Sequence, residues 1–166
     1  MTLTTNTTSP STSGLSRAVS DAIASFNHLS VDDQLGLLWV IYQSLGCSFA
    51  PSAPGAARLF LTQGLLQRLK QMSHTEQLRV FHDLLTGTDT PITRQYGMFV
   101  PNTKLAFWSQ LFEWMYAGEI VPELVSYKLS PTALHLCRKI ASLDYSEQIQ
   151  LVHQVILDMG IEPIAA

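Results

Sequence analysis

The sequence predicts an all-α protein, and three features of the chain support this prediction. Apolar residues recur at helical spacing almost everywhere from Leu15 onward. No stretch shows the period-two alternation between hairpin turns that is typical of β-strands. Prolines and glycines fall where helices would begin and end. The expected helices cover residues 15–27, 31–45, 54–71, 74–86, 91–98, 103–117, 131–142 and 145–159.

The boundaries of these helices can be justified in chain order. The first helix starts where the apolar periodicity begins. The second, fourth and eighth helices each follow a capping residue, namely Ser30, Ser73 and Asp144. The third, fifth and seventh helices have a proline in the first turn, namely Pro54, Pro91 and Pro131. The second, sixth and eighth helices end at a glycine, namely Gly46, Gly118 and Gly160.

A short pattern precedes three of these helices. It reads LSVDDQL from Leu29, MSHTEQL from Met72 and LDYSEQI from Leu143. In each copy an acidic residue lies three positions after the cap, where it can bond back to the backbone of the cap; these are Asp33, Glu76 and Glu147. The copies are 43 and 71 residues apart, and this unequal spacing excludes a solenoid of repeats.

The order of the helices predicts one domain over residues 15–166, after a disordered tail or loosely docked arm at 1–14. The middle segment, residues 87–102, is rich in glycine and proline and is expected to join two groups of helices. Each group of four is a candidate sub-bundle, and the cleft between the groups is the natural place for a ligand.

The composition limits the function. Only 14% of the residues are charged and 46% are hydrophobic, so much apolar surface must lie in a core, in an interface or around an apolar ligand. The net charge of -3 lacks the basic excess that nucleic-acid binding requires. No apolar run approaches the roughly 20 residues that span a bilayer, so no transmembrane segment is expected. The two lone cysteines, Cys47 and Cys137, fit a reducing cytoplasmic compartment.

Catalytic and metal-binding patterns do not stand out. The five histidines are scattered, without an HExxH pair or any two at i and i+4: His28, His74, His82, His135 and His153. The sequence has neither a G-x-S-x-G nucleophile elbow nor a glycine-rich phosphate loop. We therefore expect a protein that is not an enzyme.

Aromatic residues form stripes on two expected helices. Leu35, Leu38, Trp39 and Tyr42 share one face of the second helix at i, i+3, i+4 and i+7. The sixth helix carries a second stripe of Leu105, Trp108, Phe112 and Met115. Such stripes are typical of an ordinary core, and they also suit the wall of a tunnel for a rod-shaped apolar polyene. Periodicity alone leaves both interpretations open.

Four segments resemble a known family. They are DQLGLLWVIYQSLG (33–46), APGAA (53–57), TDTPITRQYGMFVPNTKLAFW (88–108) and VILDMG (155–160). In this order, and almost without gaps over residues 15–160, they are similar to the N-terminal domain of the orange carotenoid protein. The whole chain resembles the helical carotenoid proteins, which are stand-alone relatives of that domain. The resemblance implies two interleaved helical bundles that form one carotenoid-binding domain.

The resemblance also implies a cofactor and a site. The cofactor would be a keto-carotenoid of the canthaxanthin or echinenone type, with Trp39 and Trp108 packed on one end ring. Asn102 would correspond to a residue that meets the C-terminal domain in longer relatives. The implied pigment-lining residues are Leu35, Leu38, Trp39, Tyr42, Leu78, Phe81, Leu105, Ala106, Trp108, Ser109, Phe112, Met115, Ile149, His153 and Ile156.

Several positions depart from the family pattern. Ser109 replaces a tyrosine, Phe81 a methionine, Phe112 a glycine and Glu123 an isoleucine, so a reshaped tunnel is expected. His153 replaces an arginine that the family uses for domain closure and for docking on the light-harvesting antenna. A mostly neutral imidazole does not replace an arginine fork.

The leading functional hypothesis is a photoprotective quencher of singlet oxygen that binds carotenoid. Because the chain stops at Ala166, where a linker to a light-sensing domain would begin, no internal light switch is expected. The alternatives are an energy quencher docked on phycobilisomes, a carrier that passes carotenoid to a C-terminal-domain homologue, and a helical interaction domain without ligand. The expected location is the cyanobacterial cytoplasm, with peripheral thylakoid association as a further alternative.

Overall fold

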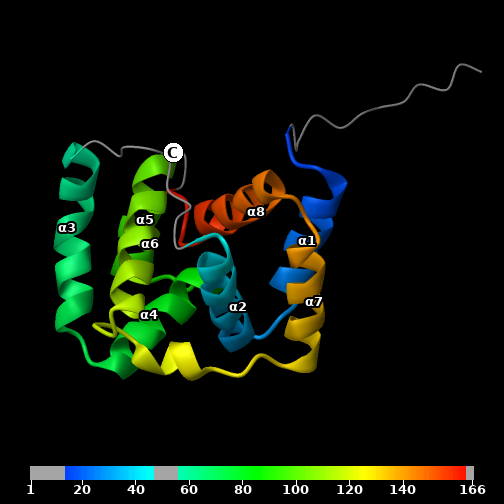
Figure 1. Cartoon of the computed structure of the whole chain (residues 1–166). Coiled ribbons are helices and arrows are strands. Elements are labelled where there is room, and N and C mark those ends of the chain that lie inside the picture. Colours follow the sequence, from blue (N-terminus) through cyan, green and yellow to red (C-terminus); the bar gives the residue numbers. More distant parts are fainter. Residues whose placement is uncertain (1–13, 47–55, 164–166) are drawn as a thin grey trace, which may run out of the picture.

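The computed structural model describes residues 14–46 and 56–163, and the regular elements in these ranges are all helical (Figure 1). The all-α prediction is confirmed. The elements are α1 (Arg17–Asn27), α2 (Val31–Ser44), α3 (Ala56–Gln71), α4 (His74–Thr86), α5 (Pro91–Gly97), α6 (Pro101–Tyr116), the 3-10 helix η1 (Pro122–Ser126), α7 (Pro131–Ala141) and α8 (Tyr145–Asp158).

The predicted boundaries agree with these elements to within two residues. Among the described residues, the largest differences are at the starts of α1 and α6; α6 begins at Pro101 because a proline at the first helical position needs no partner for a backbone N–H. The short helix η1 was not predicted. It follows Val121, whose φ of 36° is unusual for a β-branched residue. Pro54, Cys47 and residues 1–13 of the arm predicted at 1–14 lie outside the described residues.

Two copies of the repeated pattern form complete capping boxes. Ser73 accepts a hydrogen bond from Glu76 N while the Glu76 carboxylate accepts from Ser73 N, and Asp144 and Glu147 do the same at α8. The third copy is different. Ser30 caps α2, but no complete capping box forms there, and the Asp33 carboxylate accepts hydrogen bonds from Tyr127 and Ser130.

The glutamine in the repeated pattern has a role that sequence reasoning missed. Gln77 Nε2 donates to Leu69 O at 2.9 Å, in the last turn of α3, and to Met72 O at 3.2 Å, just after that helix. Gln34 and Gln148 make the same pair of bonds, to the carbonyls eight and five residues earlier in the chain. Each glutamine therefore ties its own helix to the end of the preceding helix and fixes the corner between them.

The helices form two groups that are interleaved in the sequence (Figure 1). Helices α1, α2, α7 and α8 pack together, and α3 to α6 form the second group. The groups meet where α2 contacts α4 and where α8 contacts α6. The two groups are therefore not the first four and the last four helices, as the position of segment 87–102 suggested. The chain leaves the first group after α2 and returns to it at α7, which the resemblance to the carotenoid proteins did imply.

Buried Asp33 ties α2 to the start of α7. Its carboxylate accepts hydrogen bonds from Ser130 Oγ at 2.5 Å, Ser130 N at 3.1 Å and Tyr127 Oη at 3.0 Å. Burial raises the pKa of Asp33, but these hydrogen bonds outweigh burial and hold the pKa below its usual value of 3.8. The ionised form is therefore favoured in the folded protein.

We expect Asp33→Asn to lower the free energy of unfolding at pH 7 by about 2 kcal/mol, because a charged acceptor of three hydrogen bonds is lost. Since the folded-state pKa of Asp33 is depressed, its contribution is present above the unfolded pKa and is lost as the pH falls through the folded pKa. Urea unfolding at pH 7 and pH 3 should show the difference between wild type and variant shrinking in acid. Asp21→Asn, at an exposed site on α1, is the control and should match wild type at both pH values.

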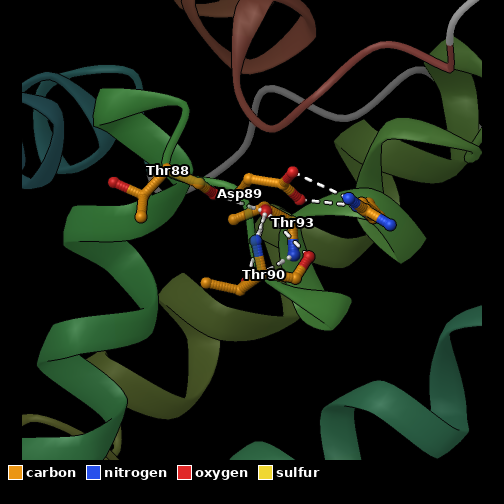
Figure 2. A network of polar contacts seen from close by, with 5 residues as sticks. Thr88, Asp89, Thr90 and Thr93 are labelled. Carbon is orange, nitrogen blue, oxygen red and sulfur yellow. Dashed lines mark hydrogen bonds and ion pairs between the residues drawn. The ribbon is translucent and has the colours of Figure 1, made fainter.

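A threonine network closes the corner between α4 and α5 (Figure 2). Thr93 is fully buried and its Oγ1 donates to Thr88 O at 2.6 Å, while Thr90 N donates to Thr93 Oγ1 at 2.9 Å. Arg94 binds the carboxylate of Asp89 with two nitrogens on the outside of this corner. The network fixes the position of α5, and so of the backbone that receives the end of the chain.

The segment after α8 is held against this corner. Gly160 N donates to Leu84 O at 2.9 Å, and Ile161 N donates to Thr93 O at 3.2 Å. A Cβ atom at Gly97 would lie 1.6 Å from Ile161 O, so only glycine allows the approach of the two backbones. Residues 156–163 thus connect the end of the first group to the second group.

Candidate functional site

A row of aromatic rings lies between α2 and α6. The Tyr42 and Phe112 rings stack with centroids 4.8 Å apart, and Trp39 lies 5.9 Å from Tyr42 and 6.2 Å from Phe112. Trp39 and Tyr42 come from the predicted stripe of α2, and Phe112 comes from that of α6. The two stripes that the sequence indicated therefore face each other.

The row continues along α6 toward α4 and α5. The Trp108 ring lies 5.4 Å from Phe112, 5.5 Å from Phe81 and 6.3 Å from Phe107. Phe107 in turn meets Tyr96 edge-on at 5.5 Å. These distances fall in the range of favourable aromatic pairs. We call the set Tyr42, Trp39, Phe112, Trp108, Phe81, Phe107 and Tyr96 the aromatic row.

The aromatic row is buried. Trp108 and Phe81 are 0% exposed, and Trp39 and Tyr42 are each 4% exposed. Their helices explain this burial, because nearly every residue from Asp33 to Tyr42 on α2 is buried and α6 is buried over 103–108. Both helices lie at the boundary between the two groups, so each is covered on several sides.

Most of the sequence-predicted site residues share one core with the aromatic row. Leu78 and Ile149 are half-buried against that core, while Ser109 and His153 are half-buried. Ala106 is buried as well. The predicted residues that lie fully within the core cluster are Leu35, Leu38, Trp39, Tyr42, Phe81, Leu105, Trp108, Phe112, Met115 and Ile156.

Two of the positions that depart from the family pattern, Phe81 and Phe112, lie in the aromatic row. The Phe112 ring contacts Trp39, Tyr42 and Trp108, and Phe81 contacts Trp108. Both departures therefore place an extra ring beside the indole that the resemblance assigns to the pigment. Glu123 lies in η1, and its side chain is outside the described residues.

Sequence reasoning missed the polar groups beside the row. Tyr96 Oη donates to Ile156 O at 2.6 Å, and Lys104 Nζ donates to Leu157 O at 3.1 Å while lying 5.4 Å from the centre of the Tyr96 ring. Both bonds satisfy carbonyls in the last turn of α8. Burial lowers the pKa of Lys104, and the carboxylates of Glu162 and Asp158 offset part of that effect. Neither Tyr96, in TRQYG, nor Lys104, in KLAFW, gave a periodic signal.

This arrangement suits an apolar, conjugated ligand. Flat rings from α2, α4 and α6 and aliphatic side chains offer stacking and dispersion contacts. Trp108 Nε1 is a buried N–H without a hydrogen-bond partner, so the row also offers one polar contact. Among the described residues, no three histidine, cysteine, aspartate or glutamate side chains are grouped to hold a metal ion.

Comparison with known proteins identifies the family. Residues 12–162 match the family model described as the orange carotenoid protein, N-terminal. The chain belongs to this family. It is 45% identical over 148 residues to an orange carotenoid-binding domain-containing protein of Nostoc sp. strain PCC 7120. The aligned region covers 89% of this chain and 86% of that protein.

Solved structures of the orange carotenoid protein family share the fold. An Anabaena (Nostoc) orange carotenoid protein that binds canthaxanthin has a TM-score of 0.82 at 40% identity, over 87% of this chain and 46% of that chain. The red carotenoid protein of the same organism, also with canthaxanthin, has a TM-score of 0.71 at 32% identity, over 86% of this chain and 97% of that one. The chain thus spans less than half of the longer relative and nearly all of the shorter one.

These comparisons confirm the predicted resemblance and the interleaved helical fold. The family is one of carotenoid-binding proteins rather than of enzymes, and its members found here are cyanobacterial. In the described part of the chain, no helix has the length and apolar character needed to cross a membrane. The individual pigment-lining residues stay predictions.

Proposed function

We propose that this protein binds a keto-carotenoid along the aromatic row and protects against light damage without chemical turnover. The observation that carries the proposal is the row itself, in which buried rings of α2 and α6 meet at positions that the resemblance implies line the pigment. The relatives with solved structures bind canthaxanthin, a carotenoid of the predicted type.

The chemistry of the site supports an apolar rod with ring-shaped ends. Trp39 and Trp108 would pack on one end ring, since indoles give large flat contact areas. Aliphatic residues from α2, α6 and α8 would border the polyene; these are Leu35, Leu38, Leu105, Met115, Ile149 and Ile156. A bound carotenoid supplies a long conjugated system that accepts excitation energy and releases it as heat.

Pigment binding must move some of these rings. Trp108 and Phe112 are 0% and 1% exposed, and their ring centroids lie 5.4 Å apart. A pigment that contacts the facing sides of both rings must therefore move them apart. Phe112 contacts the rings of Trp39, Tyr42 and Trp108, and it stands where the resemblance implies a glycine. We therefore assign to Phe112 the largest share of this rearrangement.

The finer proposal is a quencher of singlet oxygen rather than an antenna quencher. His153, half-buried on α8, stands where the family has an arginine, and an imidazole lacks the paired, permanently charged donors of a guanidinium. A carrier that delivers carotenoid to a C-terminal-domain homologue is the second candidate, because the resemblance matches Asn102 to a residue that meets the C-terminal domain in longer relatives. We place the protein in the cyanobacterial cytoplasm, with thylakoid association as an open alternative.

Quenching assays separate these roles. We expect the carotenoid-loaded protein to quench singlet oxygen strongly and to leave the fluorescence of isolated phycobilisomes nearly unchanged at pH 7. His153→Arg should increase antenna quenching, while His135→Arg, the same charge change at an exposed position of α7, should not. Strong antenna quenching by the wild type that persists in His153→Ala would show that docking does not depend on this position, and would favour the antenna role.

A further inference from the structure

One polar atom inside the aromatic row lacks a partner. Trp108 Nε1 is buried and has no hydrogen-bond acceptor, although the side chain that carries it is 0% exposed. Buried N–H groups are nearly always paired in folded proteins, so an unpaired one calls for an explanation. A buried water molecule is a poor candidate for the missing acceptor, because such a water needs two to four polar partners of its own.

The surroundings of this N–H are almost entirely apolar. The Trp108 ring contacts Phe81, Phe107 and Phe112. The polar neighbour is Tyr96, whose pKa is raised well above its usual range by burial and is drawn back in part by the Trp108 N–H. The Tyr96 hydroxyl donates its proton to Ile156 O at 2.6 Å, and the indole N–H makes no hydrogen bond of normal geometry with the phenol oxygen. Among the described residues, the indole N–H therefore has no well-aligned acceptor.

We propose that Trp108 Nε1 donates a hydrogen bond to the carbonyl oxygen on one end ring of a keto-carotenoid, and that this bond makes the site prefer keto pigments over plain carotenes. The inference rests on the proposed function and adds the atom that distinguishes two classes of pigment. A keto end ring carries its acceptor at the tip of an apolar rod, close to the ring that stacks on an indole. A hydrocarbon carotene has no acceptor and leaves the N–H unpaired.

The strength of this hydrogen bond determines how strongly the site should prefer a keto-carotenoid over a carotene. A single hydrogen bond from a neutral donor, together with the cost of leaving that donor unpaired, corresponds to a preference of about tenfold. Trp108→Phe keeps an aromatic ring at this position and removes only the N–H and part of the indole. The preference for keto pigment should therefore fall, whereas the capacity to bind a carotene should change much less.

The vibrational spectrum of the bound pigment tests the bond directly. Canthaxanthin has one carbonyl at each end, so the loaded wild-type protein should show two carbonyl stretching bands, the lower one from the hydrogen-bonded end. In Trp108→Phe the lower band should move up toward the other, while in Tyr96→Phe it should stay. A single, unshifted carbonyl band in the wild type overturns the inference, even if the Trp108 variant fails to fold. Loss of the lower band in Tyr96→Phe also overturns it, because the donor would then be the Tyr96 hydroxyl.

Competition between canthaxanthin and β-carotene gives an independent readout. The wild type should take up canthaxanthin about tenfold better than β-carotene, and Trp108→Phe should lose most of this preference. Trp39→Phe, which replaces another indole of the row with a smaller ring, should weaken the binding of both pigments to the same extent. Equal uptake of both pigments by the wild type contradicts the inference and leaves the proposed function intact. If the wild type takes up neither pigment, the proposed function itself is wrong and the inference falls with it.

Discussion

Gly97→Ala is expected to destabilise the protein by more than about 3 kcal/mol, because the added methyl group meets backbone that cannot yield. Its Cβ atom would lie 1.6 Å from Ile161 O and 2.6 Å from Ile161 C. Relief requires the segment after α8 to leave α5, which breaks the bonds from Gly160 N to Leu84 O and from Ile161 N to Thr93 O. Urea unfolding followed by circular dichroism measures the loss.

Gly64→Ala provides the matched control. Gly64 lies in α3, and a Cβ atom there would meet nothing within 4 Å. Since alanine is the better helix former, this variant should be stabilised by up to about 1 kcal/mol. Limited proteolysis should cut Gly97→Ala, but not Gly64→Ala, near the end of α8. A Gly97→Ala protein as stable as wild type would show that the close approach of the two backbones is not required.

Trp39→Ala is expected to reduce pigment affinity by at least about tenfold, since a large stacking surface beside Tyr42 and Phe112 is removed. Truncation of a buried aromatic residue also costs about 3–5 kcal/mol of stability, so the fold must be measured in the same sample. Absorption of the purified protein after expression with a ketocarotenoid pathway gives the pigment content, and circular dichroism gives the helicity.

Phe26→Ala separates a pigment contact from an ordinary core contact. Phe26 is 1% exposed in α1, outside the aromatic row, so its truncation should cost a similar amount of stability. We expect Phe26→Ala to keep its pigment and Trp39→Ala to lose it. If both variants retain an unchanged spectrum, Trp39 is a core residue only.

The helices could be predicted from the sequence because their signals are local. Caps such as Ser73 with Glu76, and prolines such as Pro91, act within one turn and mark where a helix starts. The grouping of the helices could not be predicted in the same way. It depends on the contacts of α1 with α7 and α8, which lie far along the chain, and a glycine-rich segment such as 87–102 marks a corner rather than a boundary between groups.

The candidate site was predictable only in part. The stripes on α2 and α6 do face each other, but α2 is buried on most sides, so its stripe alone does not distinguish a ligand wall from a core. The four family segments, rather than periodicity, identified the pigment. Asp33 was assigned to a cap because its spacing from Ser30 fits one, whereas its partners Tyr127 and Ser130 lie almost a hundred residues away.

The most direct test of carotenoid binding is the absorption spectrum of the protein purified from a host that makes keto-carotenoids. The proposed function predicts a coloured, folded protein that holds carotenoid in stoichiometric amount, with absorption shifted to the red of the free pigment. Circular dichroism of the same sample must show the helical fold. A protein that is repeatedly folded and colourless would contradict the central claim, and the aromatic row would then be the core of a helical domain without pigment.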